Sequence, residues 1–430
     1  MAATGLKSDS LVKKNFFKIC LLAFAGSIIY GLPYFRYYYY DAYLAAYGLN
    51  NSQMGTLGGA YGVLGLFSYL IGGILADKFP AKRLLIFSLV ATGLGGVVHL
   101  ISSSYTTLVA IYGLWGVTSL LTFWPALMKI VRMQAKDDEQ SSAYGLFEGG
   151  RGAVNAAHMA IATAIFGAFQ AKAAEGLGLK WIIVFYSVAP ILCGILFQFI
   201  FKEPRKEEKD ASEEPQKKFR FGDILSVLKM PAVWLVCIIT ASTYTFNLSY
   251  FYFTPYATNV LGLSAVFAAI LTVIAQYCRP LGSPIGGFLA DRLGKAQVML
   301  IGFIVMGVGT FVIMNLPDVG FRSYLLVCVC SIFYFAMYSN FGIYFSLLSE
   351  GGVPLKDAGI AIGLVSTIGY LPEVLCPLLA GRTLDAYEGA TGYLIYFKGM
   401  IAVAILGAVC SIIWMKYIAP RKDGAKARPA

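Results

Sequence analysis

Two short stretches, Gly73-Ile-Leu-Ala-Asp77-Lys78 and Gly287-Phe-Leu-Ala-Asp291-Arg292, decide how this chain is organised. Each one closes a long apolar run, and each is followed by further basic residues. The second stretch repeats the first at the corresponding place in the other half of the chain. An internal repeat of this kind indicates two halves that are built alike.

The composition around these stretches is that of a membrane protein. Of the 430 residues, 58% are hydrophobic and 13% are charged, whereas soluble domains carry roughly 25% charged residues. The apolar runs are about 20 residues or longer, which is enough to cross a hydrocarbon core of roughly 30 Å. We expect the first run to bend near Pro33, because it is too long for a straight crossing. The twelve predicted spans are 15–43, 52–76, 84–103, 107–131, 143–167, 181–201, 231–257, 264–288, 297–316, 323–347, 358–380 and 392–417.

The distribution of basic residues predicts the orientation. Lysine and arginine gather in both tails, in the middle of the chain and in alternate short loops. By the positive-inside rule these parts are cytoplasmic, so the net charge of +11 does not indicate a nucleic-acid partner. The expected organisation is a cytoplasmic tail at 1–14, a six-helix bundle at 15–201, a charged cytoplasmic linker at 202–230, a second six-helix bundle at 231–417 and a basic cytoplasmic tail at 418–430.

The repeated stretches resemble the signature loop of the major facilitator superfamily, Gly-x-Leu-x-Asp-Arg-x-Gly. The second copy matches it well, whereas the first carries Pro80 in place of the last glycine. The resemblance implies an all-α protein of two pseudo-symmetric six-helix bundles around a central cavity. It also implies a monomer in lipid, in the inner membrane of a bacterium. A conformational latch would involve Gly73, Asp77, Arg83, Gly287, Asp291 and Arg292.

Shorter segments are similar to an enterobacterial branch of the superfamily. They are Tyr144-Gly-Leu-Phe-Glu-Gly-Gly-Arg-Gly152 and Gln276-Tyr-Cys-Arg279, the latter followed by Pro284-Ile-Gly-Gly287. Members of that branch are suspected sulfonate or organic-anion carriers.

Three arginines at membrane depth are the first candidates for substrate binding, because ionisable groups there are costly and usually functional. Arg36 either faces the cavity, as a similarly placed arginine does in organophosphate exchangers, or extends outward to the membrane surface among its tyrosines. Arg151 shares a helix face with Glu148, three residues before it, so the two form either a structural pair or part of the site. Arg279 needs an anionic partner that can bind both of its guanidinium nitrogens.

Glu373 leaves three interpretations open. It is the salt-bridge acceptor of Arg279, a protonatable coupling group, or a hydrogen-bonding group for a sugar-like hydroxyl. Oxalate–formate exchangers of the superfamily pair an arginine in helix eight with a lysine in helix eleven, and this sequence lacks that lysine.

Aromatic and polar side chains complete the expected cavity wall, although such residues also pack between helices. They are Trp124, Tyr244, Asn247, Tyr250, Gln276, Tyr334 and Tyr338. No motif for a cofactor, a metal or a nucleophile is present, and the cysteines lie within apolar runs. We therefore expect no cofactor, no metal and no enzymatic activity.

The sequence predicts a secondary active transporter that moves a small polar solute by alternating access. The excess of arginine over glutamate among the candidates favours an organic anion, namely a carboxylate, a sulfonate or a phosphorylated compound. Its coupling partner is either a proton or a counter-anion, and exchange would keep the buried positive charge paired. The alternative is a proton-coupled symporter of neutral sugars or nucleosides. A drug exporter and a receptor are disfavoured, by the arginines and by the lack of a large polar insertion.

Overall fold

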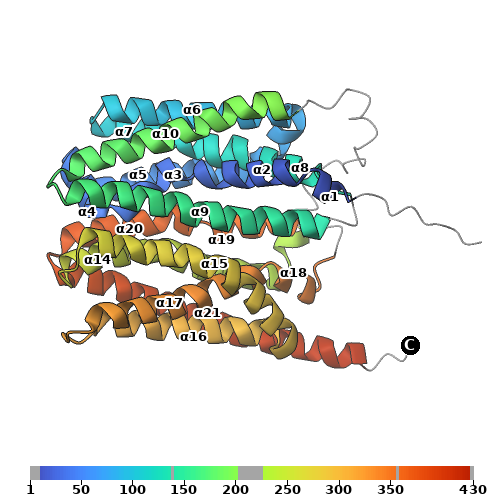
Figure 1. Cartoon of the computed structure of the whole chain (residues 1–430). Coiled ribbons are helices and arrows are strands. Elements are labelled where there is room, and N and C mark those ends of the chain that lie inside the picture. The colour runs from blue at the N-terminus through green and yellow to red at the C-terminus, as the bar shows by residue number, and fades with distance from the viewer. Residues whose placement is uncertain (1–9, 137–139, 202–225, 355–357, 427–430) are drawn as a thin grey trace, which may run out of the picture.

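The structure is a computed structural model of the chain, and it describes residues 10–136, 140–201, 226–354 and 358–426. Within these ranges every regular element is a helix (Figure 1). Most of the predicted tail 1–14 and linker 202–230 lies outside the described residues.

The first half contains α1 (Leu11–Lys14), α2 (Phe16–Ile28), α3 (Gly31–Tyr38), α4 (Tyr40–Tyr47), α5 (Asn51–Lys78), α6 (Ala81–Ile101), α7 (Tyr105–Gly116), the π-helix η1 (Val117–Phe123), α8 (Trp124–Arg132), α9 (Gln140–Gln170) and α10 (Glu175–Ile200). The second half contains α13 (Pro231–Ser249), the 3-10 helix η3 (Tyr250–Tyr252), α14 (Phe253–Asn259), α15 (Ala265–Leu293), α16 (Lys295–Met314), α17 (Arg322–Ile343), α18 (Ser346–Glu350), α19 (Ala358–Gly369), α20 (Pro372–Ala386) and α21 (Ala390–Lys426).

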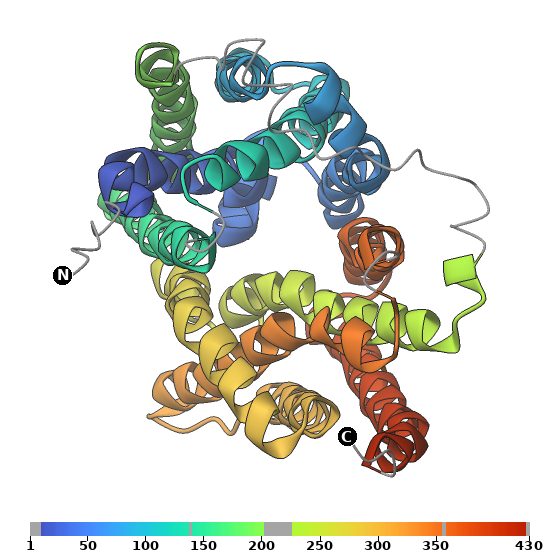
Figure 2. The ribbon, with the colours of Figure 1, turned by 90° about the vertical axis from the view of Figure 1, so that its right-hand side faces the viewer.

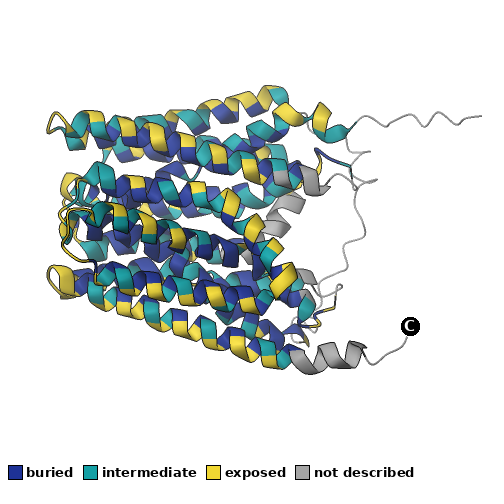
Figure 3. Ribbon diagram, turned by 60° about the horizontal axis from the view of Figure 1, so that its bottom comes forward, coloured by how far each residue is buried: buried dark blue, intermediate teal, exposed yellow. Residues whose placement is uncertain are grey.

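The long helices have the length and apolar character of membrane spans. Among the described residues, 10 helices meet both conditions, and an eleventh span follows if α2 and α3, which meet at 50°, are taken as one. The remaining predicted span, 52–76, corresponds to the 28 residues of α5, which extend about 42 Å. Figure 3 shows that exposed residues lie on the outside of the bundle. Many large hydrophobic residues are among the exposed ones, for example Phe87, Leu192 and Phe311. The predicted helical membrane protein is confirmed.

The two halves lie side by side when viewed along the bundle (Figure 2). They meet where α5 packs against α20 and α9 packs against α15. Glycines on α5 allow the backbone of α20 to come very close. A Cβ atom on Gly55 would lie 2.2 Å from the carbonyl oxygen of Pro377, and one on Gly62 would lie 2.7 Å from that of Glu373. Only glycine fits such close backbone contacts.

Prolines interrupt the helices around the interface of the halves. A proline removes one backbone hydrogen bond, and its ring collides with the carbonyl four residues earlier. Pro33 follows the break between α2 and α3 at Ile29–Tyr30, Pro125 follows the π-helical η1, and Pro255 follows the 3-10 helix η3. The expected bend near Pro33 is therefore present. Broken helices inside a membrane bundle are typical of solute sites.

Hydrogen bonds join the halves at the end of the bundle opposite α1 and the last turn of α21, which we call the far side. The Asp385 carboxylate accepts hydrogen bonds from the backbone N–H groups of Asn51 (3.0 Å) and Ser52 (2.6 Å) at the start of α5. The Asp41 carboxylate, in α4, accepts from the Thr258 hydroxyl and, at 2.8 Å, from the Asn259 amide. Burial raises the pKa of Asp41, although these two hydrogen bonds oppose the shift. The far side is thus closed in this conformation.

Candidate functional site

A cavity of about 260 Å³ lies between the two halves at the level of the broken helices. This volume lies just below the roughly 300 Å³ at which pockets for drug-sized ligands begin, so the cavity suits a small solute. The first half lines it with Ser27, Tyr30, Tyr34, Tyr38, Ser68, Leu120, Trp124, Arg151, Gly152 and Asn155. The second half lines it with Tyr244, Asn247, Tyr250, Phe251, Gln276, Arg279, Tyr338, Phe341 and Tyr370.

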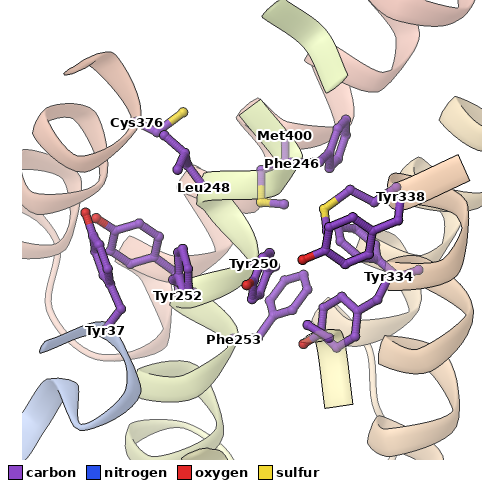
Figure 4. Close-up of a cluster of buried hydrophobic side chains, with 14 of the residues drawn as sticks. Tyr37, Phe246, Leu248, Tyr250, Tyr252, Phe253, Tyr334, Tyr338, Cys376 and Met400 are labelled. Atoms are coloured by element: carbon purple, nitrogen blue, oxygen red, sulfur yellow. The ribbon is translucent and has the colours of Figure 1, made fainter. Parts of the chain in front are cut away.

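Most of the residues expected at a substrate site line this cavity. They are Trp124, Arg151, Tyr244, Asn247, Tyr250, Gln276, Arg279 and Tyr338. Two others, Arg36 and Tyr334, do not line it. Tyr334 is fully buried against Tyr250, with ring centroids 5.1 Å apart. Figure 4 shows these two rings on facing helices, with Tyr338 beside them.

Arg279, on α15, reaches the cavity with its charge unpaired. Its guanidinium carbon lies 5.9 Å from the centre of the Tyr338 ring. Within the described part of the chain it makes no hydrogen bond or salt bridge. A guanidinium offers five N–H donors in a planar fork that matches a carboxylate, sulfonate or phosphate. Arg279 is therefore well placed to bind an anion inside the cavity.

Arg151, on α9, lines the same cavity but is already engaged. Its Nη1 donates to both carboxylate oxygens of Glu148, at 2.8 and 3.1 Å, as the three-residue spacing predicts. Its Nε donates to the carbonyl oxygen of Gly26 at 2.9 Å. The irregular turn of η1 sets Trp124 against it, with the ring centre 4.7 Å from the guanidinium carbon.

Arg36 differs from both sequence expectations, since it neither faces the cavity nor extends to the surface. Its side chain is only 1% exposed. The guanidinium carbon lies 4.0 Å from the centre of the Tyr37 ring and 4.6 Å from that of Tyr112. Aromatic faces attract a cation electrostatically, and this contact stabilises Arg36 where it is. The partner ring on α7 is far away in sequence, so the sequence does not indicate the contact.

Glu373 does not pair with Arg279, which corrects one of its three interpretations. The carboxylate is 8% exposed and accepts a hydrogen bond on each oxygen. The Tyr34 hydroxyl donates at 2.7 Å and the Tyr244 hydroxyl at 2.5 Å. Tyr34 belongs to the first half and Tyr244 to the second, so Glu373 stands where the two halves meet. Pro372 begins α20 directly before it.

A chain of neutral polar groups crosses from one half to the other along the cavity. The Ser27 hydroxyl donates to Asn155 at 3.1 Å, Asn155 donates to Gln276 at 2.5 Å, and Gln276 donates to the Tyr250 hydroxyl at 3.1 Å. His158 extends this chain, since its ring nitrogens lie 3.1 Å from Ser27 and 3.0 Å from the Tyr186 hydroxyl. Amide and hydroxyl groups of this kind bind hydroxyl groups of a solute.

Sequence reasoning missed Tyr30, Tyr34, Asn155 and Tyr370 as lining residues. Tyr34 stands in a run of tyrosines that is also typical of a membrane-interface belt. Asn155 could have been found from its spacing, because it follows Arg151 by four residues and shares its helix face. Among the described residues, no three His, Cys, Asp or Glu side chains come together in a way that could hold a metal ion.

Comparison with known proteins decides the family. The model of the Major Facilitator Superfamily matches residues 16–371, most of the chain. The chain belongs to the Major Facilitator Superfamily. It is an integral membrane transporter and not an enzyme, as that membership indicates.

The chain is 29% identical to the inner membrane protein YihN of Escherichia coli (strain K12), over 98% of this chain and 100% of that one. It is 22% identical to the probable galactarate/D-glucarate transporter GudP of Bacillus subtilis (strain 168), over 87% of each chain. Among solved structures, the nucleoside transporter NupG matches with a TM-score of 0.71 at 14% identity, over 94% of this chain and 98% of that one. This last likeness shows the fold alone.

The signature-loop residues of the superfamily lie on the side of the termini. Asp291 and Arg292 are exposed at the end of α15, and the Arg292 guanidinium carbon lies 4.2 Å from the centre of the Phe288 ring. A Cβ atom on Gly287 would meet nothing within 4 Å. In the first half Arg83 is exposed as well, whereas the side chains at Gly73 and Asp77 lie outside the described residues. Their role as a latch stays a prediction.

Proposed function

We propose that this transporter moves a small organic anion, held in the central cavity chiefly by Arg279. The observation that carries the proposal is the unpaired guanidinium of Arg279 at the cavity wall. A cation that is kept in low-dielectric surroundings without a partner is costly. An anionic solute that pairs with it removes that cost, so the cavity favours an anion over a neutral solute of the same shape.

The charges around the cavity define the expected solute further. Arg151 and Glu148 cancel each other as an ion pair, which leaves one net positive charge, that of Arg279. One carboxylate, sulfonate or phosphate group would balance it. The chain of Asn155, Gln276 and Tyr250 then offers donors and acceptors to hydroxyl or carbonyl groups on the rest of the solute. The galactarate and D-glucarate named for one relative are hydroxylated carboxylates, which supports this class.

Transport would proceed by rocking of the two halves around the site. The excess of basic residues supports the termini side as the cytoplasmic one. With Asp385 and Asp41 closing the far side, this conformation would then release solute to the cytoplasm. Opening the far side requires the cross-half hydrogen bonds of these two carboxylates to break.

The test is a thermal-shift experiment with pairs of related solutes, of which one carries an anionic group and the other does not. D-gluconate is compared with D-glucose, and glycerol 3-phosphate with glycerol. A ligand that binds only the folded protein stabilises it by about 2.7 kcal/mol at 100 times its Kd. We expect at least one anion to raise the melting temperature while its neutral counterpart does not.

Variants locate the effect at the site. In Arg279→Gln the rise in melting temperature caused by the anion should disappear. In Lys398→Gln, at an exposed position on α21, the rise should remain. Equal shifts with glucose and gluconate, or an undiminished shift in Arg279→Gln, would refute an anion site at this residue.

A second candidate is a proton-coupled carrier of neutral sugars or nucleosides. It is favoured by Glu373, a buried acid that accepts hydrogen bonds from two tyrosines of the cavity wall, Tyr34 and Tyr244. The same panel separates the candidates when uridine is added to it. Stabilisation by glucose or uridine that survives Arg279→Gln would support the neutral solute.

A further inference from the structure

We propose that Glu373 binds the proton that this transporter carries together with its anion. The inference rests on the proposed function, because it assigns the coupling ion of the same site. The ligand is a single proton, which one carboxylate oxygen takes up from water on one side of the membrane and returns to water on the other.

The first support is the enclosure of Glu373. The residue is 8% exposed, and in the described structure its carboxylate is hydrogen-bonded by two side-chain hydroxyl groups. A carboxylate buried without a positive partner is costly, and protonation removes that cost. A phenol hydroxyl both donates and accepts. Tyr34 and Tyr244 can therefore hold Glu373 in either protonation state.

The groups that face Glu373 from its neighbours contain no cation in direct contact within the described residues. Arg36 acts on it only at longer range, and Tyr37 lies next to that guanidinium. The other titratable groups near Glu373 are Tyr30 before α3, Tyr34 on α3, Tyr61 on α5, Tyr244 on α13, Tyr370 between α19 and α20, and Cys376 on α20. None of them carries positive charge.

The second support is the charge balance of the transport cycle. With the anion bound, Arg279 is neutralised, and a proton on Glu373 leaves neither of these two residues with an unpaired charge. The charge of Arg36, which lies against Tyr37 and Tyr112, is the same in every form. The loaded form can then change conformation at low electrostatic cost. Proton symport thus takes the place of the anion exchange that arginines alone would favour.

The third support is the location between the halves. The Tyr34 hydrogen bond ties α3 of the first half to α20 of the second, so separation of the halves at the far side would break it. That separation would open Glu373 to the far side, where it takes up a proton. In the present conformation Tyr34 and Tyr244 both line the cavity, so the proton can leave into cavity water past one hydroxyl.

Spin labels on the far side test the coupling without a known substrate. Ala45 and Thr391 are exposed near the far ends of the two halves. They are changed to cysteine in a background without other reactive cysteines, labelled, and their distance distribution is measured in liposomes. Between about pH 9 and pH 5 we expect the closed population to grow as the pH falls, by up to about tenfold per pH unit for one coupled proton.

Variants assign this pH dependence. Glu373→Gln should resemble the acidic form and lose the dependence, whereas Asp318→Asn, at a carboxylate that is 92% exposed, should keep it. Asp41→Asn is a second control, because the raised pKa of Asp41 also favours closure at low pH. Full pH dependence in Glu373→Gln would overturn the proposal.

Infrared difference spectroscopy gives an independent readout. The wild type should show a protonated-carboxyl band that disappears as the pH rises, and this band should be absent in Glu373→Gln but present in Asp318→Asn. A band unchanged by Glu373→Gln overturns the proposal. The thermal shift by anions depends on Arg279 and is expected to persist in Glu373→Gln, so failure of the proton site and failure of the anion site are distinguishable.

Discussion

The two walls of the cavity, α9 and α15, each present one arginine, but they treat its charge differently. On α9 the guanidinium of Arg151 is bound by Glu148 and by a backbone carbonyl. On α15 the guanidinium of Arg279 makes no hydrogen bond or salt bridge within the described residues, and its carbon lies over the Tyr338 ring at 5.9 Å from the ring centre. The charge of Arg151 is therefore already neutralised within the protein, whereas the charge of Arg279 is available to a ligand.

This difference teaches that counting arginines overstates the charge of a site. The Glu148 carboxylate interacts electrostatically with Arg279 as well as with Arg151. It can therefore compete with a bound anion for either guanidinium. The balance between the walls depends on this one carboxylate, whose side chain is 47% exposed.

Removing the cation of the neutralised wall should have the largest effect. In Arg151→Gln, Glu148 loses its partner and is left to pair with Arg279, where it blocks the anion. We expect binding of the stabilising anion to weaken by about 100-fold, in line with the cost of an unpaired charge in a site. Isothermal titration with the anion from the thermal-shift panel measures this.

The double variant Glu148→Gln/Arg151→Gln is the control for that prediction. It lacks the competing carboxylate, so it should recover much of the lost affinity. A double variant that binds as poorly as Arg151→Gln would mean that Arg151 itself contacts the anion.

Removing the carboxylate alone should have a smaller and opposite effect. In Glu148→Gln both walls carry a free guanidinium, and we expect anion affinity to rise by about tenfold. The preference should also move toward dianions, so that D-glucarate gains more than D-gluconate. Without ligand the variant should melt at a lower temperature, since Arg151 is then unpaired. A loss of anion affinity in this variant would show that Glu148 does not compete with the anion for the arginines.

The smallest effect is expected at the aromatic neighbour of the open wall. Tyr338→Leu removes the ring beside Arg279, a contact worth about 0.5–1 kcal/mol, so affinity should fall by roughly threefold. Tyr324→Leu, at a position 76% exposed on the same helix, is the matched control. A change of more than tenfold would indicate that Tyr338 binds the anion directly.

The fold and the bend in the first span were predictable because they follow from local chemistry. The length of the apolar runs predicted the membrane spans. Pro33 predicted the bend in the first span, because a proline ring collides with the carbonyl four residues before it. The two cavity arginines were found because an ionisable group at membrane depth is costly and is usually functional.

The partners of side chains across helices were not predictable. Arg36 lies against Tyr112, a contact that depends on how α3 and α7 are arranged. Glu373 finds Tyr34 and Tyr244 because three separate helices meet there. A single sequence shows which face of a helix is polar, but it does not show which helix that face meets.

The glycine face of α5 has a consequence for how the halves come apart. Because Gly55 and Gly62 present no side chains to α20, little has to interlock or change rotamer along this contact when the helices part. The two helices can therefore separate along this contact with little rearrangement, and a few hydrogen bonds at the far side hold them together. A substitution to alanine at either glycine would add a methyl group that keeps the two helices apart. Such variants are therefore the simplest way to trap the transporter open toward the far side.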